Sequence, residues 1–227
     1  PQSLPLAPTL FSEEFAARLA IEMKIGDLRA EHQVIAEWIS EGARVLDLGC
    51  GDGSFLAALN NEKSVTGYGV EIDPDNIVRC IERGVNVIHA NLDEGLSGFE
   101  ESSFDFVVMT QTIQALKSPH LLIREILRIG KEGIVTFPNM GHWRCRIQFL
   151  LGKMPVTKQL PDSWYKTPNI HICTIDDFES LCDSLNINII ERAILDAQHR
   201  PFKIMELMPN LFGEIAIYRT RQEKAWN

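Results

Sequence analysis

Residues 45–55, VLDLGCGDGSF, contain three glycines and two aspartates in a turn that follows an apolar run. Gly49, Gly51 and Gly53 allow the backbone to turn tightly and to approach a bound molecule without an intervening Cβ. A helix that begins after this turn would aim its free N–H groups and its positive end at the same molecule. The stretch therefore predicts a ligand-binding turn between a strand and a helix.

Asp47 lies two residues before the first of these glycines, and it narrows the kind of ligand. A carboxylate beside the pocket disfavours a pyrophosphate but suits an ammonium group. The glycine spacing, G-C-G-D-G, also departs from the G-x-G-x-x-G of dinucleotide sites. S-adenosylmethionine (SAM) carries an ammonium and a sulfonium but no phosphate, so we expect SAM, or S-adenosylhomocysteine, rather than NAD. The remaining alternative is a plain turn with solvated acidic residues.

A second acidic residue ends the next apolar run. Glu71 lies 24 residues after Asp47, where a carboxylate at a strand end can accept hydrogen bonds from both ribose hydroxyls. Asn91 and Leu92 occupy the position expected for an adenine edge, and Ile72 would cover the face of the ring. The expected cofactor contacts are Asp47, Gly49, Cys50, Gly51, Gly53, Glu71, Ile72, Asn91, Leu92 and Thr110.

Strand and helix patterns alternate along the chain, and these elements must position the residues above. Apolar, β-rich runs predict strands at 44–49, 65–72, 85–89, 104–110, 133–139, 187–195 and 213–220. Helical spacing occupies 12–24, 27–39, 54–60, 75–84, 120–129 and 178–185. The alternation predicts a three-layer, doubly wound, Rossmann-like α/β fold, with a mostly parallel seven-stranded sheet and an antiparallel pair at one edge.

Local signals mark where several of these helices begin. Ser12 is expected to cap the first helix. Asp73-Pro74 and Ser118-Pro119 each place a capping residue before a proline at the first helical position. Residues 174–177, Thr-Ile-Asp-Asp, have the pattern of a capping box.

We expect one domain with an insertion. Residues 1–26 form an N-terminal arm and helix, and residues 27–227 form the SAM-binding domain. The irregular stretch at about 139–173 is too long for an ordinary connection and is a candidate functional segment. It could be a lid over an acceptor pocket, a docking surface for another protein, or a solvated insertion. Its aromatic and basic residues, of types common at interfaces, are Trp143, Trp164, Tyr165, Arg144, Arg146, Lys153, Lys158 and Lys166, against the single acid Asp162.

The composition is that of an ordinary globular protein, with 45% hydrophobic residues and a net charge of −9. An acidic surface repels phosphate backbones, so we expect no nucleic-acid partner. The chain has no apolar run of about 18 residues and no signal-peptide pattern, so we expect no membrane association and a cytoplasmic location. The five scattered cysteines suit a reducing compartment, and no metal-ligand spacing occurs.

No residue is assigned a catalytic role. The segment TQTIQAL contains no proline–aromatic pair, and Gln111 and Gln114 either face the pocket or pack. His142 and His171 flank the irregular segment, and each is a general base or, more commonly for a lone histidine, a packing residue.

Several longer pieces resemble known proteins. VLDLGCGDG, GYGVEID, SFDFVVMTQTIQAL and GIVTFPN are similar to the motifs of class I SAM-dependent methyltransferases. GVEIDPDNIVRCIERGVNVI, FPNMGHWR, GKMPV and WYKTPNIHICTIDDFESLC more closely resemble the MetW family of methionine biosynthesis. The likeness runs from about residue 27 to 220 and leaves out residues 1–26. It includes the irregular segment, which generic methyltransferases do not share.

The resemblance implies a cytosolic protein that works beside homoserine O-acyltransferase, its expected protein partner, and supports the activity of that enzyme. The cofactor contacts that it implies are Asp47, Gly49, Gly51, Glu71 and Leu92. Asn91 departs from the aspartate often found at this position, although its Oδ1 can still accept a hydrogen bond. The alternative is an active SAM-dependent methyltransferase with an unidentified small-molecule acceptor.

Overall fold

The structure is a computed structural model that describes residues 23–157, 159–196 and 207–222. The helix predicted over residues 12–24, with its cap Ser12, lies almost wholly outside the described residues.

A seven-stranded sheet in the order β3-β2-β1-β4-β5-β7-β6 forms the middle layer of the described fold. Strands β1 to β5 run parallel, whereas β7 is antiparallel to both of its neighbours, β5 and β6. The predicted architecture is therefore confirmed, including the antiparallel pair at one edge. The strands are Arg44–Leu48 (β1), Thr66–Glu71 (β2), Asn86–His89 (β3), Phe104–Thr110 (β4), Gly130–Pro138 (β5), Ile187–Leu195 (β6) and Ile215–Gln222 (β7).

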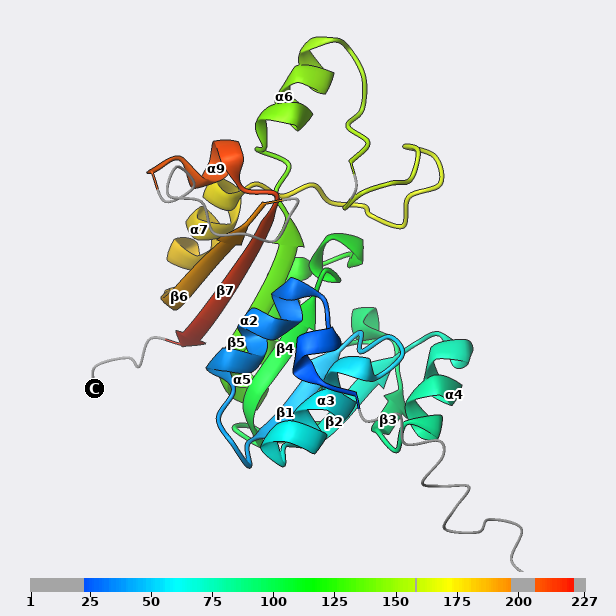
Figure 1. Ribbon diagram of the computed structural model, residues 1–227. Coiled ribbons are helices and arrows are strands. Elements are labelled where there is room, and N and C mark those ends of the chain that lie inside the picture. Colours follow the sequence, from blue (N-terminus) through cyan, green and yellow to red (C-terminus); the bar gives the residue numbers. More distant parts are fainter. Residues whose placement is uncertain (1–22, 158, 197–206, 223–227) are drawn as a thin grey trace, which may run out of the picture.

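Helices cover both faces of the sheet and bury two apolar cores against it (Figure 1). One core joins the sheet to α2, α3 and α4, and the other joins it to α5 and α7. Strands β1 and β4 are covered on both faces of the sheet, which explains their nearly continuous apolar sequences. The helices are Ala30–Trp38 (α2), Ser54–Lys63 (α3), Pro74–Glu82 (α4), Pro119–Ile129 (α5), Trp143–Leu150 (α6), Ile175–Ser184 (α7) and Pro209–Phe212 (α9), with short 3₁₀ helices Ile25–Asp27 (η1), Leu92–Glu94 (η2) and Ile113–Ala115 (η3).

The predicted helix starts are confirmed, with one difference in chemistry. Asp73 accepts a hydrogen bond from Asp75 N at the start of α4, and Thr174 forms a reciprocal capping box with Asp177 at the start of α7. Ser118 occupies the cap position of α5, but its side chain makes no capping hydrogen bond within the described part of the chain. Pro119 alone sets the first turn of that helix.

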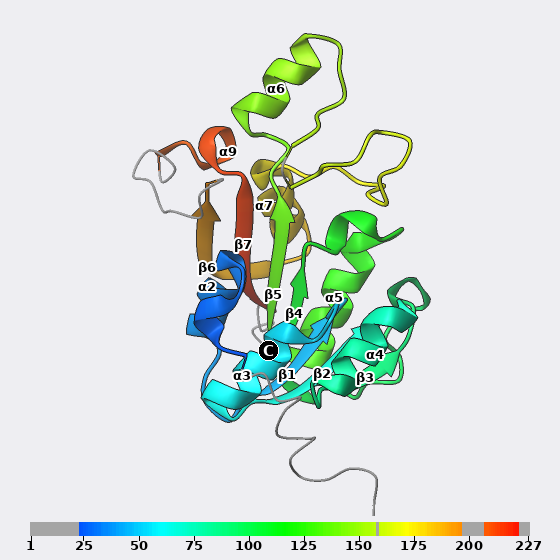
Figure 2. The ribbon, with the colours of Figure 1, turned by 45° about the vertical axis from the view of Figure 1, so that its right-hand side comes forward.

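The segment predicted to be irregular contains a helix, α6, that projects beyond the carboxyl ends of the strands (Figures 1 and 2). His142 starts it by accepting a hydrogen bond from Arg144 N through Nδ1. The prediction missed α6 because Cys145 is its one buried residue, so its sequence lacks the apolar stripe that marks a packed helix.

Residues 139–157 and 159–173, which include α6, form what we call the projecting lobe. Asn139 fastens the base of this lobe. Its side-chain amide donates to Asn210 O at 3.0 Å and to Gly213 O at 2.9 Å, and its Oδ1 accepts from Gly141 N and Ile175 N. Met140 N also donates to Cys173 O, which brings the two ends of the segment together. One buried side chain thus connects β5, α7 and the turn before β7.

We expect Asn139→Ala to lower the free energy of unfolding by on the order of 2–4 kcal/mol, because buried backbone groups lose their partners. Urea unfolding measures the change, and Asn188→Ala on exposed β6 is the control, expected to leave the midpoint unchanged. Equal midpoints for the two variants would contradict the anchoring role of Asn139.

Candidate functional site

The glycine turn lies at the carboxyl end of β1, between β2 and β4. Gly49, Gly51 and Gly53 all have positive φ, at 77°, 56° and 75°. A Cβ on Gly49 would meet Thr112 Oγ1 at 2.7 Å, and one on Gly53 would meet Cys80 Sγ at 2.9 Å. Gly49 and Gly53 therefore permit close packing, whereas Gly51 has open space on the side where a Cβ would point.

A cavity of about 390 Å³ lies between this turn and the N-terminal helical segment. Five of the predicted cofactor residues line it: Asp47, Gly49, Cys50, Gly51 and Thr110. The other five predicted residues are outside its lining: Gly53, Glu71, Ile72, Asn91 and Leu92. Its remaining described lining residues are Met23, Asp27, Leu28, Arg29, His32, Asp52 and Ser54.

Glu71 is tied to the turn from the end of β2. Its Oε2 accepts from Gly51 N at 2.8 Å, and its Oε1 accepts from Ile72 N and Asp73 N at 2.8 and 2.9 Å. These three backbone donors fix the carboxylate next to Gly51, which lines the cavity. Its oxygens can accept further hydrogen bonds, because each offers more than one lone pair.

The residues expected at the adenine end, Asn91, Ile72 and Leu92, are outside the cavity lining. Asn91 caps η2, with its Oδ1 accepting from Asp93 N at 3.0 Å and its amide 3.5 Å from Glu94 Oε1. The Ile72 side chain is exposed, and Leu92 packs against the core. Their roles as cofactor contacts stay predictions.

Asp47 is a buried carboxyl group in the lining of the cavity. Its Oδ1 has no hydrogen-bond partner among the described residues. Burial raises the pKa of Asp47 to about 7; the nearby Glu71 charge raises it further, while the Arg29 charge opposes the shift. Because buried acceptors are almost always paired in folded proteins, an unpaired one inside a cavity points to a donor that a ligand would supply.

Glu31 and His32 are buried polar residues of α2 that the sequence prediction missed; His32 lines the cavity, whereas Glu31 contacts Arg29 of its lining. Glu31 is buried, and its Oε1 accepts from Gln111 Nε2 at 2.9 Å and lies 3.2 Å from Arg29 Nη1. Leu28, Glu31, His32 and Ile35 follow the i, i+3, i+4, i+7 spacing of a core-facing stripe. Two polar residues on that apolar stripe were the signal that could have revealed them.

His32 is a neutral member of this cluster. Its ring stacks on Phe55 with centroids 4.6 Å apart, and its Nε2 lies 3.1 Å from Arg29 Nη2. Burial lowers the pKa of His32 to about 3, and the Arg29 charge lowers it further. Since a guanidinium can only donate, Nε2 accepts and Nδ1 carries the proton.

Two glutamines that follow β4, Gln111 and Gln114, belong to a hydrogen-bonded network. Gln111 has a positive φ of 50°, and its backbone N donates to Thr136 Oγ1 at 3.0 Å. Gln114 is buried and donates from Nε2 to Gln111 O at 2.8 Å, while its Oε1 lacks a partner in the described chain. Both glutamines are thus held in a network rather than lining the cavity.

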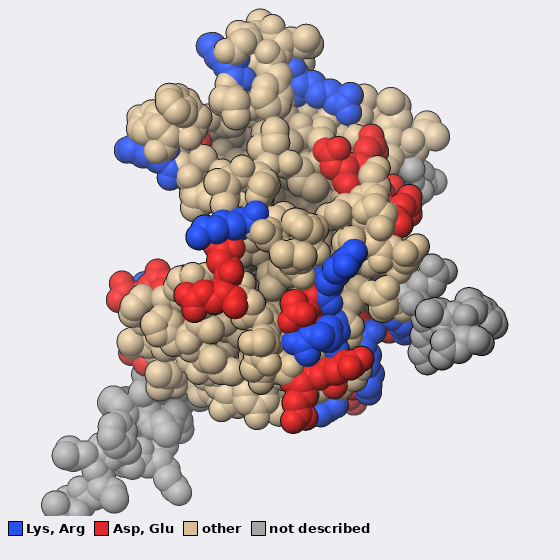
Figure 3. Space-filling model, turned by 180° about the vertical axis from the view of Figure 1, so that it is seen from behind, with Lys and Arg blue, Asp and Glu red and all other residues tan. Residues whose placement is uncertain are grey.

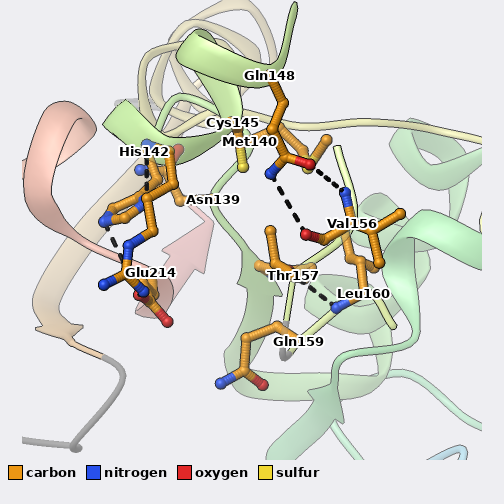
Figure 4. Close-up of a pocket in the computed structure, with 12 residues that line it drawn as sticks. Asn139, Met140, His142, Cys145, Gln148, Val156, Thr157, Gln159, Leu160 and Glu214 are labelled. Carbon is orange, nitrogen blue, oxygen red and sulfur yellow. Dashed lines mark hydrogen bonds and ion pairs between the residues drawn. The ribbon is translucent and has the colours of Figure 1, made fainter. Parts of the chain in front are cut away.

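His142 and His171 are both placed away from the glycine turn. His142 lines a second cavity, of about 300 Å³, at the base of α6, where its Nε2 lies 3.9 Å from Glu214 Oε1 (Figure 4). Burial lowers the pKa of His142, and the Arg144 charge adds to the shift. Gln148 closes this cavity by bonding both the N and the O of Val156. His171 is exposed, with Nε2 3.4 Å from Lys117 O.

Within residues 23–157, 159–196 and 207–222, no helix is both long and apolar enough to cross a membrane. The same residues contain no group of three or more His, Cys, Asp or Glu side chains arranged to hold a metal ion.

Comparison with known proteins assigns the family. Residues 29–220 match the family described as methionine biosynthesis protein MetW. The chain belongs to the MetW family. A curated relative, the bifunctional methionine biosynthesis protein MetXA/MetW of Rhodopirellula baltica, is 32% identical over 206 residues, which are 86% of this chain but 33% of the relative. The chain therefore spans about a third of the length of that relative.

The fold of this MetW family member recurs in SAM-dependent methyltransferases. A possible histamine N-methyltransferase from Thermotoga maritima has a TM-score of 0.61 at 19% identity, with 93% of this chain and 96% of that chain covered. The complex of the Haloferax volcanii Trm112 methyltransferase activator with a putative methyltransferase gives a TM-score of 0.62 at 16% identity, over 95% of this chain and 98% of that chain. At such identities the likeness shows the fold.

The raised pKa of Asp47 predicts a pH-dependent cost to stability. The folded state holds this proton up to about pH 7, whereas the unfolded state releases it near pH 3.8. Stability from this group is therefore lost as pH rises between these values. We expect Asp47→Asn, which cannot ionise, to gain stability over the parent chain by on the order of 1–3 kcal/mol between pH 5 and pH 8. Urea unfolding at the two pH values measures this, and a pH-independent difference would contradict the shift.

Proposed function

We propose that this MetW family member binds SAM or S-adenosylhomocysteine at the glycine turn and acts in methionine biosynthesis as the partner and activator of a homoserine O-acyltransferase. A cytoplasmic location agrees with this role. The observation that carries the partnership is the bifunctional methionine biosynthesis relative MetXA/MetW, whose name joins a MetXA part to a MetW part in one protein. The resemblance to the MetW family implies homoserine O-acyltransferase as the partner. Fusion holds two parts together permanently, so separate chains with the same roles are expected to associate.

The residues around the cavity fit SAM. Asp47 Oδ1 is a buried acceptor with no partner among the described residues, Gly51 leaves open space, and Glu71 lies beside Gly51 at the end of β2. Asp27 and Asp52 add acidic groups to the lining, which suits a ligand with an ammonium and a sulfonium. When bound, SAM supplies an activated methyl group.

Titration calorimetry with SAM tests the cofactor assignment. We expect Asp47→Ala and Glu71→Ala each to weaken binding by about 1.5–3 kcal/mol, the value of a charged hydrogen bond. Glu82→Ala, on the exposed face of α4, is the matched control and should bind as the parent chain does. Unchanged affinity in both site variants would remove the assignment.

The projecting lobe supplies the surface that best fits a protein partner. Leu150 is 85% exposed, Leu151 71% and Trp164 73%. Exposed apolar residues continue along the whole segment: Trp143, Ile147, Phe149, Met154, Val156, Tyr165, Ile170 and Ile172. So many large exposed apolar side chains in one segment are typical of a surface that another molecule covers. Viewed from behind, the lobe is mostly uncharged with a few basic side chains, whereas both acidic and basic side chains lie on the body (Figure 3).

We assign this lobe to the acyltransferase and expect the complementary surface to be apolar with an acidic rim. Arg144, Arg146, Lys153 and Lys166 supply the positive charge, and Lys158 lies outside the described residues. The lid and solvated-insertion alternatives predict no loss of association when the apolar residues change.

The double variant Leu150→Asp/Leu151→Asp should abolish association with the acyltransferase, because two charges would be buried without partners. Leu121→Asp, on an exposed position of α5, is the control and should associate normally. Sedimentation of the mixed proteins, together with the acyltransferase rate, measures both effects. Normal association of the double variant would exclude the lobe as the docking surface.

The second candidate function is methyl transfer to a small-molecule acceptor. It is favoured by the buried Gln114, whose Oε1 lacks a partner in the described chain and whose Nε2 donates to the carbonyl of Gln111, the residue after Thr110 of the cavity lining. Formation of S-adenosylhomocysteine in the presence of homoserine-pathway metabolites would support it. Absence of that product with every such metabolite would count against it.

A further inference from the structure

Two thiols from different elements meet beside the glycine turn. Cys50 belongs to the turn that follows β1, Cys80 lies in α4, and their Sγ atoms are 3.8 Å apart. Cys80 Sγ donates its hydrogen to Gly51 O at 3.2 Å. Because a thiol carries a single hydrogen, the contact between the two sulfurs is then donated by Cys50, and a lone pair of Cys80 Sγ points toward Cys50. The pair therefore has the arrangement in which one sulfur can attack the other.

Glycines provide the room for both sulfurs. A Cβ on Gly69 of β2 would collide with Cys50 Sγ, and a Cβ on Gly53 would lie 2.9 Å from Cys80 Sγ. A larger residue at either position would push one of the sulfurs aside. The contact between the thiols thus depends on backbone that carries no side chain in two separate parts of the fold.

The two thiols differ in their access to small molecules. Cys50 lines the cavity of about 390 Å³, so a small reagent in that cavity reaches its sulfur, whereas Cys80 is fully buried. Burial raises the pKa of both thiols, and the Asp47 charge adds to the rise at Cys50. Little thiolate is therefore present at neutral pH, and a reaction at this pair is expected to be slow. The difference in access makes Cys50 the first thiol to react and Cys80 the second.

We propose that Cys50 and Cys80 form a redox-sensitive modification site, at which a hydroperoxide that enters the cavity converts the two thiols into a disulfide. The Cys50 sulfur attacks one oxygen of hydrogen peroxide and breaks the O–O bond, which leaves a sulfenic acid and releases water. The Cys80 sulfur then attacks the Cys50 sulfur, and the hydroxyl leaves as water with the Cys80 proton. The two thiols lose two electrons, the peroxide gains them, and a dithiol such as dithiothreitol reverses the step.

Forming this bond would move the glycine turn. A disulfide holds its sulfurs at about 2.05 Å, so those of Cys50 and Cys80 must approach from 3.8 Å by roughly 1.8 Å. Gly51 is tied to both sides of this movement, since its O accepts from Cys80 and its N donates to Glu71. Oxidation also removes the hydrogen that Gly51 O accepts. This consequence rests on the proposed SAM site: the oxidised chain should bind SAM on the order of 10-fold more weakly, the effect of about one lost hydrogen bond.

The experiment treats the full chain with excess hydrogen peroxide, alkylates the remaining thiols in denaturant and maps the tryptic peptides by mass spectrometry without reduction. Cleavage after Lys and Arg places Cys50 in residues 45–63 and Cys80 in residues 80–83, each with one cysteine. We expect these two peptides to be joined, with loss of the two thiol hydrogens, and to separate when dithiothreitol is added. Alkylation of both cysteines in the treated chain would overturn the site.

Two single variants test the order of events. In Cys80→Ser, Cys50 should stop at the sulfenic acid, which dimedone labels, whereas in Cys50→Ser the buried Cys80 should stay a free thiol. Cys145→Ser, at a buried cysteine of the lobe, is the matched control and should give the same joined peptides as the parent chain. Dimedone labelling of Cys80 in place of Cys50 would contradict the assigned order.

Calorimetry with SAM on the reduced and the oxidised chain separates this inference from the proposed function. We expect the weaker affinity of the oxidised chain to recover after dithiothreitol. If the reduced chain binds SAM and the joined peptides form without weakening that binding, the effect on the cavity fails and the SAM site stands. If the reduced chain binds no SAM, the proposed cofactor site fails, while the peptide map still decides the disulfide.

Discussion

The buried carboxylate of Asp47 is the constraint around which the site is arranged. It lies near the end of a strand that is covered on both faces, and the rise of its pKa to about 7 expresses the cost of its burial. The glycine turn after it leaves the Cβ-free side of Gly51 open, and Arg29 at the start of α2 lines the same cavity. An acceptor kept buried and unpaired stabilises a bound cation more than a solvated one would, because no hydration is lost when the ligand arrives. The fold thus gives up stability at Asp47 in a way that favours a ligand.

Local chemistry explains what the sequence predicted correctly. The turn at Gly49, the cap at Asp73 and the capping box at Thr174 depend on residues within a few positions of one another. The burial of Glu31 and the helix α6 depend on contacts with distant segments, such as the bond from Gln111. No periodic pattern encodes such contacts. The same holds for Asn91, whose side chain caps a short helix that its sequence position did not reveal.

The projecting lobe differs from the rest of the protein in how its apolar residues are used. On the sheet, residues such as Val108 and Ile134 are fully buried in a core, whereas Leu150 and Leu151 on the lobe are largely exposed. Such exposure is costly for a free protein, so it is expected where a partner covers the surface. Asn139 fastens the base through four hydrogen bonds, so the lobe presents these residues from a fixed point. A fixed base reduces the entropy lost when a partner binds.

A continuous line of hydrogen bonds joins the cavity to this lobe. Glu31 Oε1 contacts both Arg29 and Gln111, Gln111 O accepts from Gln114, and Gln114 O accepts from Ile170 N and His171 N on the returning arm of the lobe. Contiguity does not by itself couple two sites, because coupling requires an element whose equilibrium a ligand changes. Glu31 is the residue shared along this line, because its Oε1 contacts both the Arg29 guanidinium and the Gln111 amide. Gln111 is held at a positive φ of 50°, so the line passes through a residue whose backbone conformation depends on its surroundings.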